Sequence, residues 1–232
     1  MSHPNDCNVY ALRCGDRYLV IDTGVGIGYE DILRELHNDE VRPSQIEAIL
    51  LTHGHLDHAG GAHCLHEILQ APVFASQLTA DALQSGNEEA ISLADAKRAG
   101  LYPPEVKLKP CSVDRVLSHR ATFQVGDCRI TALHTPGHSS DMLSYLVETS
   151  DETLLFCGDT VFHGGTLLLQ DAWDCDLRAY TASLRSLGEI AFDGLYPGHG
   201  LWSVRDGSRH IEKCLSFIHR MLIPPSLLSG VS

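Results

Sequence analysis

The stretch THGHLDH, residues 52–58, places three imidazole rings and one carboxylate within six consecutive positions. It follows the apolar run IEAILL, residues 46–51, which is typical of a buried strand. A loop at the end of a strand can hold metal ligands rigidly and still leave coordination positions open. A catalytic zinc ion takes three protein ligands, so four ligand-type side chains in one short run indicate part of a larger site.

Three further motifs end or follow predicted strands and carry ligand-type side chains. They are TPGH at 135–138, GDT at 158–160 and PGHG at 197–200. With THGHLDH they offer seven ligands, which suits two metal ions about 3.5–4 Å apart. Imidazole and carboxylate ligands favour two Zn²⁺ ions, with iron or manganese as alternatives. The candidate metal ligands are His53, His55, Asp57, His58, His138, Asp159 and His199.

Apolar periodicity predicts alternating strands and helices, and hence one α/β domain over residues 1–232. The Ala-rich segment at about 79–104 has helical spacing, and we expect it to form a helical cap inserted over the domain. A hairpin is predicted over 8–22, with its turn at Gly15-Asp16. Helices are predicted over 29–38, 62–70, 176–187 and 208–222, and further strands over 72–75, 123–126, 129–135, 143–148, 153–157 and 194–196.

Composition argues against several classes of protein. The formal net charge of −13 arises from 30 acidic and 17 basic side chains, so nucleic acids and anionic membranes are disfavoured partners. There is no apolar run long enough for a membrane span, and the N-terminus lacks a signal-peptide pattern. The eight cysteines form no CxxC pair, which indicates reduced thiols. We expect a cytoplasmic protein, with its oligomeric state open and a dimer as one option.

The four motifs, in this order, resemble those of the metallo-β-lactamase superfamily, whose signature is HxHxDH followed by three later ligands. The stretch IDTG, residues 21–24, is similar to an early turn of that family, and the resemblance covers roughly residues 8–200. It implies an α/β fold, a four-layer αββα sandwich with the metals at one edge of two sheets. It also implies that Asp22 orients a ligand histidine, while an Asp that caps the turn is the alternative.

The chemistry expected of such a site is hydrolysis. Two dications held by two carboxylates and five neutral imidazoles keep a net positive charge, which would activate water near neutral pH. Asp57 is the candidate catalytic residue, because it can steer the attacking water and carry a proton to the leaving group. No GxSxG nucleophile motif is present. The resemblance implies that His53, His55 and His138 hold one metal, that Asp57, His58 and His199 hold the other, and that Asp159 bridges both.

The substrate is less sharply indicated than the reaction. The GDT motif is similar to the glyoxalase II branch, which implies a small acyl substrate, with a hydroxyacylglutathione-type thioester as the first expectation. That branch binds the glutathione carboxylate with a Lys or Arg, and residues 161–170 contain neither. The lactonase branch, which acts on acyl-homoserine lactones or other esters, has a Tyr where Phe162 stands. Phe162 and His163 are candidate substrate contacts.

A reaction of another class remains as an alternative. The superfamily includes persulfide dioxygenases, which use a single iron. The complete set of ligands for a second metal, Asp57, His58 and His199, favours two metals and hydrolysis over that oxidoreductase.

Overall fold

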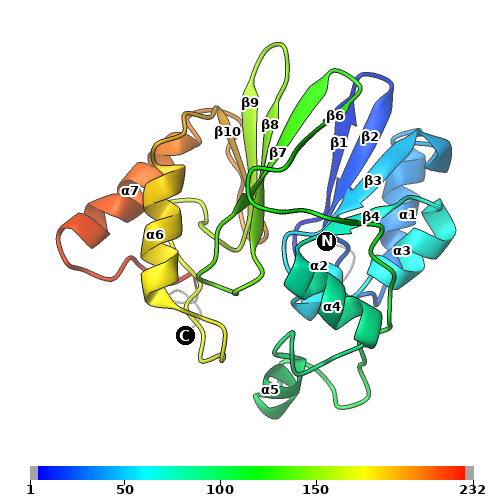
Figure 1. Cartoon of the computed structure of the whole chain (residues 1–232), viewed down its shortest axis with the longest axis horizontal. Helices are drawn as coiled ribbons and strands as arrows, with labels where there is room; N and C mark the ends of the chain where they lie inside the picture. The colour runs from blue at the N-terminus through cyan, green and yellow to red at the C-terminus, as the bar shows by residue number, and fades with distance from the viewer. Residues whose placement is uncertain (1–4, 228–232) are drawn as a thin grey trace. The chain divides into compact units, whose positions relative to one another are not determined.

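The computed structural model describes residues 5–227 (Figure 1). Its contacts divide the chain into two compact units. The first unit runs to Ser118 and includes Val125–Asp127, and the second comprises His119–Gln124 and the chain from Cys128 onward. Each of the two sheets has five strands. That the whole chain forms one domain stays a prediction.

The sheet of the first unit begins with the predicted hairpin and continues with parallel strands. β1 and β2 pair antiparallel across the Gly15-Asp16 turn, so the hairpin prediction is confirmed. β3 lies parallel to both β2 and β4, because the chain returns through a helix between strands. The order is β1-β2-β3-β4-β5, with β1 Tyr10–Cys14, β2 Arg17–Ile21, β3 Ile46–Leu50, β4 Val73–Ala75 and β5 Arg115–Val116.

Helices cover one face of this sheet (Figure 1, blue to green). Their apolar side chains recur at helical spacing, and Ile32, Leu36 and Leu65 pack with Ile49 and Val73 of the strands. Segment 79–104 contains the end of α4 and all of α5, joined by turns, and its role as a cap stays a prediction. The helices are α1 Tyr29–Asn38, α2 Leu56–Ala59, α3 Ala62–Leu69, α4 Gln77–Ser85 and α5 Leu93–Arg98, with a 3₁₀ turn at Pro43–Gln45.

The second unit carries the other sheet and two long helices. Tyr180 and Leu184 of α6 and Ile211 of α7 pack with Leu155 and Leu195 of the strands. β10 is parallel to β9, whereas β7, β8 and β9 run antiparallel in turn. The order is β10-β9-β8-β7-β6, with β6 Thr122–Val125, β7 Cys128–His134, β8 Leu143–Glu148, β9 Thr153–Gly158, β10 Gly194–Pro197, α6 Leu177–Leu187 and α7 Ser208–His219.

One predicted helix end differs from the structure, and two short elements were not predicted. α7 ends at His219, three residues before the predicted end at Leu222, because residues 220 and 221 form a turn ahead of Pro224-Pro225. The short elements α2 and β5 were not predicted, because one helical turn and a two-residue strand carry no periodicity.

The eight cysteines are free thiols, as expected. Among residues 5–227, no helix is long and apolar enough to cross a membrane.

Candidate metal centre

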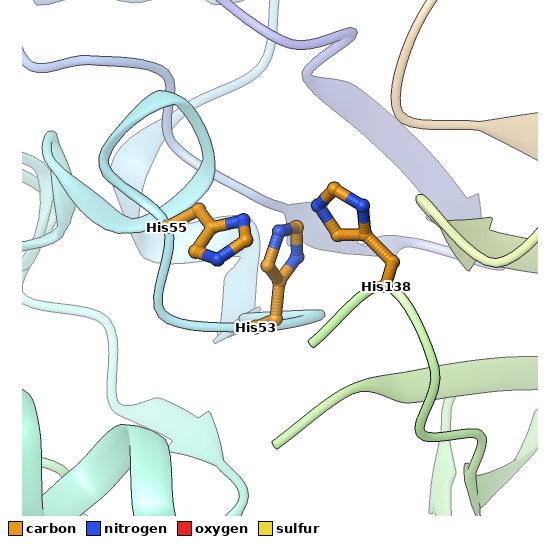
Figure 2. Close-up of side chains that lie close together, drawn as sticks. All are labelled: His53, His55 and His138. Atoms are coloured by element: carbon orange, nitrogen blue, oxygen red, sulfur yellow. The ribbon is translucent and has the colours of Figure 1, made fainter. Parts of the chain in front are cut away.

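The loop after β3 gathers the four candidate ligands of the first unit. His53 precedes the short helix α2, His55 is its N-cap, and Asp57 and His58 lie within its single turn. The ring centroid of His53 is 4.6 Å from that of His55 and 4.1 Å from that of His58. Figure 2 shows the rings of His53 and His55 from this loop. The helical turn therefore brings three imidazoles together.

Asp22 lies directly behind this cluster. Its Oδ2 atom is 2.8 Å from Nδ1 of His58, and its Oδ1 atom accepts a hydrogen bond from the backbone N–H of Thr52 at 2.7 Å. The backbone of Asp22 has φ of 61°, an unusual conformation for a residue with a side chain. Asp22 is 2% exposed. The structure thus places Asp22 against a candidate ligand histidine as well as at a turn.

The IDTG turn is hydrogen-bonded to α2. The backbone N–H and the hydroxyl of Thr23 both donate to the carbonyl oxygen of His58 at 2.7 Å. Gly61 N donates to Gly24 O at 3.0 Å. A Cβ atom on Gly61 would lie 2.2 Å from the carbonyl oxygen of Thr23, and one on Gly60 would lie 2.3 Å from that of Val25. The glycines after the ligand motif are therefore required by close backbone contact.

Asp57 is the more accessible of the carboxylates next to this cluster. Its side chain is 20% exposed, whereas that of His58 is fully buried. Its Oδ2 atom lies 3.8 Å from Nε2 of His58. A carboxylate that is partly open to solvent can exchange protons, which the expected role of Asp57 requires.

Cys7 is a neighbour of the cluster that the sequence motifs did not indicate. Single ligand-type atoms of Cys7, Asp22 and His58 lie within 4.8 Å of one another. Burial raises the pKa of the Cys7 thiol to about 12, with His58 opposing the shift. Thiolates and not thiols bind metals, so burial disfavours the form of Cys7 that would act as a ligand.

The second unit brings its three candidate ligands together at the ends of its strands. His138 follows β7, Asp159 follows β9 and His199 follows β10. Oδ2 of Asp159 lies 3.5 Å from Nε2 of His138 and 3.4 Å from Nε2 of His199. His138 and Asp159 are each 2% exposed in their side chains, whereas His199 is 25% exposed. One carboxylate oxygen thus faces two imidazole nitrogens, an arrangement suited to a bridging ligand.

Groups remote in sequence orient these ligands. Nδ1 of His138 donates to the carbonyl oxygen of Leu168 at 3.1 Å, which leaves Nε2 as the ring's acceptor. The hydroxyl of Tyr180, on α6, donates to the carbonyl oxygen of Asp159 at 2.5 Å. Burial raises the pKa of Tyr180 well above its ordinary value, so the phenol stays a donor. Sequence reasoning missed Tyr180, although a Tyr on the apolar face of a helix is a signal for a buried hydrogen bond.

The two candidate substrate contacts lie in different surroundings. Phe162 is 1% exposed, and its ring centroid is 6.2 Å from that of His199. His163 is exposed, and its ring lies 4.5 Å from that of His210. The structure therefore places Phe162 beside a candidate ligand and His163 beside α7. A role for either residue in substrate binding stays a prediction.

His210 and Ser203 form a pair that could be mistaken for a catalytic dyad. The Nε2 atom of His210 is 2.7 Å from the Ser203 hydroxyl, and its Nδ1 accepts a hydrogen bond from Gly164 N at 2.9 Å. Since Nδ1 is an acceptor, the neutral ring carries its proton on Nε2 and donates it to Ser203. Burial lowers the pKa of His210 to about 4. The ring therefore cannot activate Ser203, and it anchors the loop through Gly164.

The residues fit divalent metal ions. Their donors are imidazole nitrogens and carboxylate oxygens, a set that suits zinc, iron or manganese. The Nδ1 atoms of His53, His58 and His138 contact protein oxygen atoms. The Nε2 atoms lie on the opposite ring edges, and those of His53 and His58 are buried. This is the usual support of metal-binding histidines.

Comparison with known proteins establishes the family. The model of the metallo-β-lactamase superfamily matches residues 4–207. A metallo-β-lactamase from Cronobacter sakazakii with a HARLDQ motif has a TM-score of 0.74 at 19% identity, over 95% of this chain and 89% of that one. The B3 metallo-β-lactamase BLEG-1 has a TM-score of 0.71 at 22% identity, over 87% and 90%. The chain belongs to the metallo-β-lactamase superfamily and has its α/β fold, as the motifs predicted.

Several curated relatives carry names that describe their activities. Acyl-coenzyme A thioesterase MBLAC2 of Gallus gallus is 29% identical over 84% of this chain and 73% of its own length. Atrochrysone carboxyl ACP thioesterase of Aspergillus fumigatus is 30% identical over 83% and 50%. Beta-lactamase-like protein 2 homolog of Drosophila melanogaster is 28% identical over 83% and 58%. The chain spans about half the length of the last two relatives.

Proposed function

We propose that this chain is a metal-dependent hydrolase of acyl thioesters. The observation that carries the proposal is the carboxylate of Asp159, whose Oδ2 lies 3.5 Å from Nε2 of His138 and 3.4 Å from Nε2 of His199. A carboxylate oxygen that lies near two imidazole nitrogens suits a centre with two metal ions. When bound, such ions activate water and polarise a carbonyl group.

The proposed ligands fall into two sets that share Asp159. Zinc is the proposed metal, with iron or manganese as alternatives, because the donors are nitrogen and oxygen atoms. Asp57 is the proposed proton carrier, since its side chain is 20% exposed. The first set is His53, His55 and His138, and the second is Asp57, His58 and His199.

Relatives and sequence together favour a thioester over other acyl substrates. Relatives named as thioesterases act on acyl groups attached to coenzyme A or to an acyl carrier protein. A hydroxyacylglutathione is the small thioester of the same chemistry, and we propose it as the first substrate to test. Residues 161–170 supply no cation for its carboxylates. An acyl-homoserine lactone is the alternative, although the buried Phe162 offers no hydroxyl group.

A substrate panel with measured metal content tests the proposal. The panel contains lactoylglutathione, an acyl-coenzyme A, an acyl-homoserine lactone, an aryl ester, a chromogenic cephalosporin and a phosphodiester. We expect two divalent ions per chain and the highest kcat/KM for a thioester. A protein that holds two ions and hydrolyses no thioester would contradict the substrate class. One iron per chain, with oxygen uptake on glutathione persulfide, would replace the hydrolase with a dioxygenase.

A further inference from the structure

The hydroxyl group of Thr52 lies at the centre of a buried network behind the ligand loop. Its Oγ1 atom is 2.9 Å from Oδ2 and 3.1 Å from Oδ1 of Asp22. The same atom is 3.1 Å from Nδ1 of His53 and 3.4 Å from Nδ1 of His58. Thr52 is 1% exposed, and both histidines are fully buried. One hydroxyl therefore touches a carboxylate and two candidate ligand rings.

Counting protons gives each contact a direction. An ionised carboxylate only accepts hydrogen bonds, so Asp22 receives the Nδ1 proton of His58 at 2.8 Å and the hydroxyl proton of Thr52 at 2.9 Å. Thr52 has a single proton, and once that proton points at Asp22 its oxygen can only accept from His53. The proton of His53 must then lie on Nδ1. Both rings consequently present an unprotonated Nε2, the form that binds a metal.

The backbone and the side chain of Thr52 together fix the position of its hydroxyl group. The backbone N–H of Thr52 donates to Oδ1 of Asp22 at 2.7 Å, and the side chain of Thr52 contacts the same carboxylate. A β-branched side chain also has few accessible χ1 rotamers. Thr52 is therefore held in one orientation between Asp22 and His53.

We propose that Thr52 is a positioning residue that relays the charge of Asp22 to His53. Through this relay one carboxylate fixes the tautomers of two histidines, His58 directly and His53 by way of the hydroxyl. The assignment of these histidines to two metal ions rests on the proposed function, in which His53 and His58 belong to different ligand sets. The relay itself rests only on the contacts of Thr52 within the first unit.

The relay predicts an asymmetric response to substitution. Thr52→Val removes the hydroxyl at nearly constant volume, so His53 loses its contact with the Thr52 oxygen while His58 keeps its contact with Asp22. Thr52→Ser retains the hydroxyl and is the matched control. Asp22→Asn weakens the support of both rings. Loss of such a supporting contact reduces metal affinity by about 10- to 100-fold.

Two measurements on the full-length chain test the relay. Long-range ¹H–¹⁵N correlation spectra of the metal-free protein at neutral pH report which ring nitrogen carries the proton. Zn²⁺ titration against a chromophoric chelator reports the stepwise affinities. We expect the Nδ1–H tautomer for His53 and His58 in the wild type and in Thr52→Ser. In Thr52→Val we expect loss of that tautomer at His53 alone, with about 10- to 100-fold weaker binding of one Zn²⁺.

The outcomes that would overturn the relay are separate from those that would overturn the function. An Nε2–H tautomer at His53 in the wild type removes the relay without any variant, so the test survives even if Thr52→Val does not fold. An unchanged tautomer and Zn²⁺ affinity within twofold in Thr52→Val also overturn it. Absence of thioester hydrolysis contradicts the proposed function and leaves the tautomer result intact.

Discussion

Asp57 differs from the two buried histidines of its loop, His53 and His58, by its exposure to solvent. Its side chain is 20% exposed beside the fully buried His58, and α2 holds both on one turn. A buried ligand mainly holds a metal, whereas an accessible carboxylate can also exchange protons with substrate. Substitution of Asp57 can therefore separate metal binding from proton transfer experimentally.

Substitution Asp57→Ala is expected to abolish most turnover while one metal ion is retained. Loss of a general acid–base group reduces kcat by about 10²- to 10⁴-fold. The measurements are steady-state kinetics on the substrate found in the panel and metal content per chain. Asp81→Ala, on the exposed face of α4, is the control and should retain activity. Unchanged turnover in Asp57→Ala would remove Asp57 from the mechanism.

Gly61 illustrates how a residue without functional groups supports the site. Gly61→Ala would place a Cβ atom 2.2 Å from the carbonyl oxygen of Thr23. The backbone must move, and we expect about 3 kcal/mol of destabilisation from such overpacking. Gly100→Ala is the contrast, since Gly100 has φ of 77° but nothing within 4 Å. It should cost about 1 kcal/mol. Urea unfolding of both variants measures the difference, and equal losses would contradict the steric argument.

At the scale of elements, α6 contacts Asp159, the proposed bridging ligand of the second unit. Tyr180 donates its hydroxyl to the carbonyl oxygen of Asp159, and Ser183 on the next turn donates to that of Pro136 at 2.7 Å. A Cβ atom on Gly137 would lie 2.5 Å from Cα of Tyr180. The helix thus contacts both the TPGH and the GDT loops through hydrogen bonds and close packing.

Substitution Tyr180→Phe tests this support. It leaves the buried carbonyl of Asp159 without the hydroxyl, which should cost about 1–3 kcal/mol of stability. Thr181→Ala, which removes an exposed hydroxyl from the same helix, is the control and should change stability by less than about 0.5 kcal/mol. Thermal unfolding and Zn²⁺ affinity are the measurements. Equal behaviour of the two variants would show that the Tyr180 hydroxyl does not position Asp159.

The loop between β9 and α6 is anchored to α7 by a histidine that resists protonation. Burial lowers the pKa of His210 to about 4, below its ordinary value of 6.5. The unfolded chain therefore binds one more proton than the folded chain between these two pH values. Stability must fall as the pH falls from 6.5 toward 4, because the slope of stability with pH follows that proton difference.

Substitution His210→Gln should remove this part of the acid sensitivity. A glutamine oxygen can still accept from Gly164 N, but it does not titrate. Urea unfolding at pH 7 and pH 4.5, with chelator present throughout, should show up to about 3 kcal/mol less acid-induced loss in the variant than in the wild type. Equal losses in the two proteins would assign the acid sensitivity to other groups.

Across the whole molecule, the proposed ligands come from both compact units of the chain. His53 belongs to the first unit and His138 to the second. Under the proposed function, metal binding therefore stabilises both units. The net charge of −13 also favours cations over anionic partners.

Metal removal should consequently lower stability as well as activity. A ligand at 100 times its Kd stabilises the folded state by about 2.7 kcal/mol. We expect chelation to lower Tm and abolish hydrolysis, and added Zn²⁺ to restore both. Mg²⁺ is the control ion, because it prefers an octahedral shell of oxygen atoms. Activity that survives complete chelation would contradict the metal-dependent mechanism.

The sequence predicted most elements because apolar periodicity is strong where helices and strands are long. α1 over Tyr29–Asn38 and β8 over Leu143–Glu148 have the expected bounds. Candidate ligands could be named because they lie in compact motifs. The groups that orient them could not, because the Leu168 carbonyl is a main-chain atom and Tyr180 lies 21 residues from Asp159. No local pattern records such contacts.

The hydrogen bond between His138 and the Leu168 carbonyl oxygen means that the main chain of this loop, rather than one of its side chains, supplies this contact to the ligand. The acceptor for Nδ1 of His138 is a carbonyl oxygen, so every amino acid at position 168 supplies it. Gly164, which His210 holds through a backbone N–H, is likewise independent of neighbouring side chains. The side chain at position 168 can therefore be varied while the main-chain acceptor that orients the histidine is kept.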